Sequence, residues 1–113
     1  MQNHINLVQG DTGPDLTVTV YDSISNEPID LSASGSTCRL HVRREEQIGT
    51  PAVTTVTGAK TNGGGDGVIT FQWPSGTFDV VGFYEAEVEM DLDTGKRQTV
   101  PDKIRIYARA QIA

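Results

Sequence analysis

The sequence is poor in the residues that mark several classes of protein. Its single cysteine, Cys38, has no partner for an internal disulfide, and its inward-facing position in an alternating run suits a small hydrophobe. Nine Lys and Arg residues, scattered along the chain, oppose fifteen Asp and Glu residues, which gives a formal charge of −6. Nucleic acid and anionic membrane are therefore not expected partners. Because no apolar stretch has the length of a signal peptide or a membrane span, we expect a protein made in a cytosol and kept there unless a particle carries it out.

The length and the apolar pattern predict one all-β domain, residues 1–113. A chain of 113 residues can bury a hydrophobic core without a metal or a disulfide. Apolar residues recur at every second position almost throughout, and no window shows a helical stripe. The predicted strands cover residues 5–8, 16–22, 37–43, 52–57, 67–73, 83–92 and 103–109. About seven short strands favour an immunoglobulin-like antiparallel β-sandwich over an open sheet.

Charge patterning predicts the order of three strands in one sheet. In the run 83–92, the outward positions are all acidic: Glu85, Glu87, Glu89 and Asp91. Such a row repels itself unless basic side chains flank it. Two other runs carry these on their outward positions, namely Arg39, His41 and Arg43, and Lys103, Arg105 and Arg109. We therefore expect the run 83–92 to lie between 37–43 and 103–109, with Glu87 between Arg39 or His41 and Arg105.

The other sheet, in which we expect the N-terminal strand to lie, is predicted to have a neutral outer face. One interpretation is a solvated threonine-rich sheet. The other is a face covered by a neighbouring subunit, because its side chains lose little hydration on docking. An added strand along the segment 4–9 would be a second way to bind a partner. The candidate interface residues are Thr17, Thr19, Tyr21, Val68 and Thr70.

The triplet Asp-Thr-Gly occurs twice, at residues 11–13 and 93–95. It is the signature of aspartic proteases, whose two carboxylates share one proton. Neither copy has the required surroundings. Pro14 follows the first copy and has no backbone N–H to donate, whereas Lys96 and Arg97 follow the second in a predicted exposed hairpin. Both triplets are interpreted as turns, in which the Asp caps the backbone and the Gly takes a positive φ.

Other constellations that could carry chemistry are weaker. The glycine-rich loop 61–67 offers too few oxygen ligands for calcium. His4 and His41 lie on different predicted strands without a third ligand, so no zinc site is expected. The sequence contains no phosphate-cradling loop and no serine nucleophile elbow. We therefore predict a non-enzymatic protein with no catalytic residue, no cofactor and no bound metal.

Five short motifs follow one another along the chain. They are Gly10-Asp11 before the second strand, Asp30-Leu31-Ser32 after a proline, Gly67 leading to a strand that ends at Trp73, Gly82 to Glu87 opening a long strand, and Thr99-Val100-Pro101 before the last strand. In this order, they resemble the immunoglobulin-like domain at the N-terminus of bacteriophage baseplate upper proteins and of related tail and virion proteins. The chain departs from that pattern around residues 22–37, where a hairpin glycine is missing and a connection is longer.

The resemblance implies a non-enzymatic structural subunit of a tailed bacteriophage virion, in the tail, the baseplate or a neck adaptor, or as a capsid decoration. Such a subunit would be assembled in the host cytoplasm, reside in the virion in multiple copies and bind other virion proteins. A carbohydrate-binding or adhesive module is the alternative, with Tyr21, Phe78, Phe83 and Tyr107 as candidate exposed aromatics. An aspartic protease is the third alternative. Trp73 and Tyr84 are instead predicted to be buried, with the Tyr84 hydroxyl bound to a backbone group.

Overall fold

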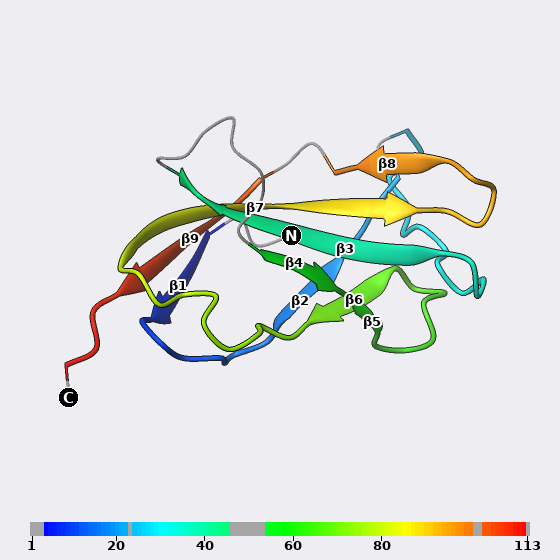
Figure 1. Cartoon of the computed structure of the whole chain (residues 1–113). Coiled ribbons are helices and arrows are strands. Elements are labelled where there is room, and N and C mark those ends of the chain that lie inside the picture. Colours follow the sequence, from blue (N-terminus) through cyan, green and yellow to red (C-terminus); the bar gives the residue numbers. More distant parts are fainter. Residues whose placement is uncertain (1–3, 23, 46–53, 101–102, 113) are drawn as a thin grey trace.

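The computed structural model describes residues 4–22, 24–45, 54–100 and 103–112, whose strands form two packed sheets (Figure 1). The first sheet contains β1 (His4–Val8), β3 (Thr37–Arg44), β4 (Thr54–Thr57), β7 (Gly82–Asp91), β8 (Arg97–Thr99) and β9 (Ile104–Arg109). The second sheet contains β2 (Leu16–Thr19), β5 (Ala59–Lys60) and β6 (Val68–Phe71). The chain is therefore an all-β sandwich, as the sequence predicts.

The strand order in the first sheet confirms the prediction from charge patterning. The order is β1-β9-β7-β3-β4, with β8 paired to the second half of β7. β7 thus lies between β3 and β9 and runs antiparallel to both. In the second sheet β6 lies between β2 and β5. Residues 54–60 border both sheets, because β4 ends the first, β5 ends the second, and Gly58 lies between them.

The N-terminal strand differs from the predicted arrangement. β1 pairs in parallel with β9 in the first sheet, and does not lie beside β2 in the threonine-rich sheet. The alternation of inward and outward side chains along β1 is compatible with either sheet, because both sheets contribute to one core. Leu7 points into that core and is 4% exposed. The hydrogen bonds that follow the strand fix its place: the Gln9 N–H donates to the Arg109 carbonyl at 2.8 Å, and the Gly10 N–H donates to the Phe78 carbonyl at 3.1 Å.

The core contains a chain of three aromatic rings. Trp73, Phe78 and Tyr84 meet edge to face, with ring centroids 5.0 and 5.1 Å apart. The Trp73 indole donates to the Pro14 carbonyl at 2.9 Å, and the Tyr84 hydroxyl donates to the Val80 carbonyl at 2.6 Å. Trp73 and Tyr84 are 4% and 2% exposed, so their predicted burial is confirmed. The two hydrogen bonds attach the loops that precede β2 and β7 to the core.

Several strand bounds differ from the predicted ones. β2 ends at Thr19, and beyond it Tyr21 forms an isolated bridge with Pro28. Residues 52–53 of the fourth predicted strand lie outside the described residues, and β4 covers Thr54–Thr57. The short strands β5 and β8 were not predicted. Among the residues described, no helix is long and apolar enough to cross a membrane.

Candidate interaction surfaces

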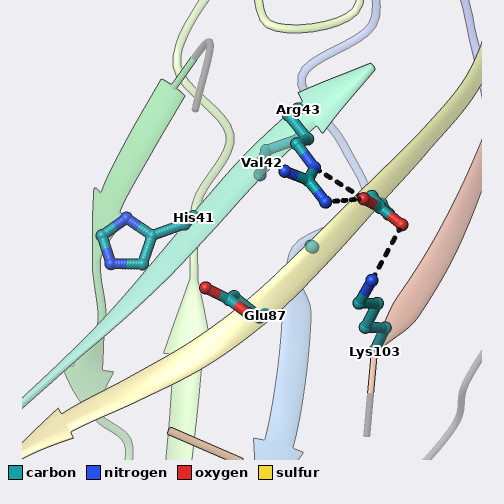
Figure 2. A pocket seen from close by; sticks show the side chains of 7 residues that line it. His41, Val42, Arg43, Glu87 and Lys103 are labelled. Carbon is teal, nitrogen blue, oxygen red and sulfur yellow. Dashed lines mark hydrogen bonds and ion pairs between the residues drawn. The ribbon is translucent and has the colours of Figure 1, made fainter. Parts of the chain in front are cut away.

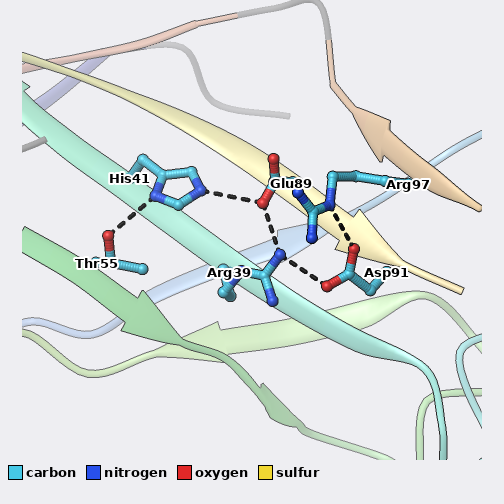
Figure 3. Close-up of polar contacts among 6 residues, drawn as sticks. All are labelled: Arg39, His41, Thr55, Glu89, Asp91 and Arg97. Atoms are coloured by element: carbon cyan, nitrogen blue, oxygen red, sulfur yellow. Dashed lines mark hydrogen bonds and ion pairs between the residues drawn. The ribbon is translucent and has the colours of Figure 1, made fainter. Parts of the chain in front are cut away.

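The outer face of the first sheet carries a network of ion pairs between β3 and β7 (Figure 3). Arg39 Nη2 donates to Glu89 Oε1 at 2.6 Å and lies 2.7 Å from Asp91 Oδ2. His41 Nε2 lies 3.3 Å from the same Glu89 oxygen, and its Nδ1 lies 3.0 Å from Thr55 Oγ1. The hydrogen bonds from Arg39 and His41 lower the pKa of Glu89. β3 therefore neutralises this part of the acidic row.

Nearer the start of β7, Glu85 forms ion pairs with Arg43 and Lys103, whose side chains are labelled in Figure 2. Arg43 Nε donates to Glu85 Oε1 at 2.6 Å, and Lys103 Nζ lies 3.5 Å from Oε2. Burial alone would raise the pKa of Glu85, but the hydrogen bond and the charge of Arg43, together with Lys103, outweigh burial, so the pKa lies below its usual value. A hollow of about 200 Å³ adjoins these side chains and includes His41 and Glu87 in its wall.

Glu87 has one of the two basic neighbours predicted for it, but no hydrogen bond to that neighbour among the described residues. It lies opposite His41 in the ladder, but the His41 ring hydrogen-bonds to other residues. Arg105 lies opposite Glu85, and its guanidinium binds both carboxylate oxygens of Glu45, at 2.9 and 3.0 Å. The predicted neighbour on β3 is therefore confirmed, because His41 lies opposite Glu87, whereas the predicted neighbour on β9 is wrong, because Arg105 lies opposite Glu85.

The same face carries exposed aromatic side chains at the start of β7. Phe83 is 42% exposed, and its ring centroid lies 4.8 Å from that of Tyr107, its partner in β9. The Arg105 guanidinium carbon lies 4.2 Å from the centre of the Phe83 ring. We call Phe83, Arg105 and Tyr107 the aromatic patch. The sequence indicated Phe83 and Tyr107 as separate candidates, and only the strand register brings them together, whereas the candidate Phe78 is fully buried.

The predicted interface residues of the second sheet do share one face. Thr17 lies opposite Thr70, and their hydroxyl oxygens are 3.2 Å apart. The Thr70 hydroxyl also lies 2.6 Å from the hydroxyl of Thr61, so these threonines satisfy one another. Tyr21 is 50% exposed at the end of the row. The shared face does not show that a partner binds there. The role of Thr17, Thr19, Tyr21, Val68 and Thr70 as interface residues stays a prediction.

The residues considered for catalysis or metal binding are not brought together. Asp11 lies in the β1–β2 connection and Asp93 in the β7–β8 hairpin, and these two connections lie at opposite ends of the sandwich (Figure 1). In the part of the chain that the structure describes, no three His, Cys, Asp or Glu side chains are grouped so that they could hold a metal ion. Cys38 is buried, and burial raises the pKa of its thiol to about 12, which makes it a poor nucleophile.

Comparison with known proteins supports the fold and corrects the predicted role. Neither a family model nor a curated protein matches the chain. Among solved structures, the chain is similar to CopC from Methylosinus trichosporium OB3b, with a TM-score of 0.53 and 9% identity, over 99% of this chain and 87% of CopC. At this identity, the likeness shows the fold alone, a β-sandwich. This neighbour points away from a structural subunit of a tailed bacteriophage virion, so that prediction is contradicted. Membership of the baseplate upper protein family stays a prediction without a matching family model.

Proposed function

We propose that this chain is a non-enzymatic binding domain that docks on another protein through the aromatic patch. The observation that carries the proposal is the exposed Phe83 ring, which contacts Tyr107 and Arg105 on one sheet face. β7 and β9 are hydrogen-bonded to each other and to further strands on their other sides, so the patch stands on a rigid support. Rigid side chains lose little conformational entropy on binding.

The chemistry of the patch favours a protein as partner. Aromatic side chains and arginine are enriched among the residues that dominate protein–protein affinity. The bidentate bonds to Glu45 hold the Arg105 guanidinium in place before a partner arrives. A flat sugar ring would need a free aromatic face, but the guanidinium lies over Phe83, and the Phe83 and Tyr107 planes are inclined by 37°. The net charge of −6 also favours a protein over nucleic acid.

The aromatic patch offers more than the predicted threonine face. On the second sheet, the Thr17, Thr61 and Thr70 hydroxyls already bond to one another, and a partner gains little by replacing those bonds. Tyr21 is the large exposed side chain among the five predicted interface residues, and no ring contact supports it in the described part of the chain. On the patch, two aromatic rings and a guanidinium are already packed together before docking.

Site-specific photo-crosslinking tests the proposal. A photoreactive phenylalanine analogue placed at Phe83 should crosslink a protein other than a second copy of this chain in the cells that make it, whereas the same analogue at Tyr21 should not crosslink that protein. Tyr21 is a matched control because it is aromatic and similarly exposed, and it lies just beyond β2 of the other sheet. Once the partner is identified, Phe83→Ser should weaken binding by about 2 kcal/mol or more, which is about thirtyfold in Kd.

The control arms separate the alternatives. A crosslink from Tyr21 to a different protein, with none from Phe83, would move the interface to the threonine face that the sequence predicts. Binding of an oligosaccharide that is lost in Phe83→Ser would replace a protein partner with a carbohydrate. Unchanged partner affinity in Phe83→Ser, with the fold intact by circular dichroism, would contradict the proposal.

A further inference from the structure

The second sheet has an open edge along β2. β2 pairs with β6, and no other strand of the described residues pairs with it. The N-terminal strand, which would cover this edge if it lay in the second sheet, pairs with β9 instead. Open edges of sheets are usually protected by charged side chains or proline. Residues 16–20 of this chain contain neither.

The backbone groups that face the open edge can be assigned from the ladder. The Val20 N–H donates to the Gly67 carbonyl at 3.0 Å, which is on the β6 side. In an antiparallel pair, alternate residues direct both backbone groups to the same neighbour, so Val18 also bonds toward β6. The N–H and C=O groups of Thr17 and Thr19 therefore point to the open edge. The side chains of the same two residues lie on the outer face of the sheet.

We propose that β2 pairs antiparallel with β2 of a second copy of this chain. With Val18 opposite its own copy, Thr17 lies opposite the partner's Thr19, and each such pair exchanges two backbone hydrogen bonds. Leu16 then lies opposite the partner's Val20, so buried side chains meet buried side chains and the two cores become continuous. The two three-stranded sheets join into one across the two-fold axis.

We propose a second copy of this chain as the partner of the β2 edge because β2 is complementary to itself at this register. Threonine faces threonine on the outer side, as Thr17 and Thr70 already do within the chain, and such cross-strand pairs are favourable. The nearest acids do not meet each other: Asp15 lies opposite the partner's Tyr21, and Asp22 lies opposite the partner's Pro14. No acid therefore lies directly opposite another acid along the β2–β2 pair, which we call the seam.

Hydrogen exchange measured by NMR over a concentration series tests the pairing in the unmodified protein. The Thr17 and Thr19 amides should exchange fast at low concentration and become protected as sedimentation velocity shows the dimer forming. The Val18 and Val20 amides, which face β6, should be protected throughout. A protein that stays monomeric, or a dimer in which the Thr17 and Thr19 amides stay unprotected, would overturn the proposal.

Two substitutions of Thr19 distinguish the contribution of its backbone N–H to dimerisation from that of its side chain. Thr19→Pro removes the outward N–H but keeps the bonds to β6, and proline is tolerated at such edge positions. It should weaken dimerisation by about tenfold or more, because each copy loses a hydrogen bond. Thr19→Ala keeps the N–H and should dimerise nearly as well as the original protein. Equal dimerisation of the Pro and Ala variants, both folded, would show that β2 does not form the seam.

If Thr19→Pro does not fold, Thr19→Lys provides the second test, because it places two like charges near the seam and leaves the backbone unchanged. Its dimerisation should weaken while circular dichroism stays that of a β-sandwich. Unchanged dimerisation in Thr19→Lys would contradict the proposal. Phe83→Ser should not affect the dimer, so failure of the seam and failure of the aromatic patch are distinguishable.

Discussion

Replacing Glu85 by Gln tests how much the ion pairs of the outer face stabilise the fold. The Glu85 side chain is 13% exposed, with Arg43 Nε at 2.6 Å and Lys103 Nζ at 3.5 Å. The amide keeps the size of the side chain and removes its charge, so both cations lose this partner. A hydrogen bond to a charged group contributes about 1.5–3 kcal/mol. Solvent access at the sheet surface reduces this, and we expect a loss of about 1–2 kcal/mol in the free energy of unfolding.

Glu87→Gln is the matched control, since Glu87 lies two residues further along the same strand and face without an ion pair in the described residues. Its free energy of unfolding should change by less than about 0.5 kcal/mol. Urea denaturation at neutral pH measures both variants, and the midpoint is compared at unchanged slope. Equal stabilities of Glu85→Gln and Glu87→Gln would refute the reasoning.

The stability difference between the original protein and Glu85→Gln should depend on pH. The pKa of Glu85 in the folded chain is lowered from 4.5, so its contribution is fully present above pH 4.5 and is lost as the pH falls through the lowered value. The stability difference between the original protein and Glu85→Gln should therefore shrink progressively below pH 4.5. A difference that stays constant into strongly acidic solution would show that the effect is steric and does not depend on charge.

Three further predictions concern packing. Tyr84→Phe removes the hydroxyl that donates to a backbone carbonyl at 2.6 Å, and it should cost about 1 kcal/mol in chemical denaturation; no loss would mean that this bond adds nothing net. Gly58→Ala would make a Cβ overlap with Ile69 Cγ2 and should cost about 1–3 kcal/mol in thermal unfolding. Gly65→Ala is the control, because its Cβ would have its nearest neighbour at 3.9 Å, and it should be near neutral. Cys38 should react with a thiol reagent only on unfolding, because it is buried with a pKa of about 12, and rapid reaction of the native protein would contradict this.

The strand order β3-β7-β9 could be predicted because side-chain alternation is a property of the backbone. Once Tyr84 and its alternate neighbours are assigned to the core, Glu85 and Glu89 must point outward, and they need basic strands on both sides. The structure shows those strands, with Arg43 and Arg39 bound to the two acids. The individual partners could not be predicted in the same way, because they depend on register and on where each strand begins.

The position of β1 and the aromatic patch depend on contacts that no local pattern encodes. The alternation of β1 is the same beside β2 or beside β9, and hydrogen bonds made after the strand ends decide between them. Phe83 and Tyr107 are distant in sequence and meet because Gly82 pairs with Ala108 at the start of the β7–β9 ladder. An outward aromatic on one strand is unremarkable alone. Two of them packed with an arginine make the surface that we propose as a binding site.

The place of β1 connects the two proposals. By joining β9, β1 leaves the β2 edge open, so the same choice that extends the first sheet makes the second sheet available to another copy. The aromatic patch belongs to the outer face of the first sheet, and the seam belongs to the edge of the second, so pairing along β2 uses none of the patch residues. A dimer formed in this way presents two patches. A partner that carries repeated sites would then bind the dimer more tightly than one domain, without any new contact, because the second docking event is intramolecular.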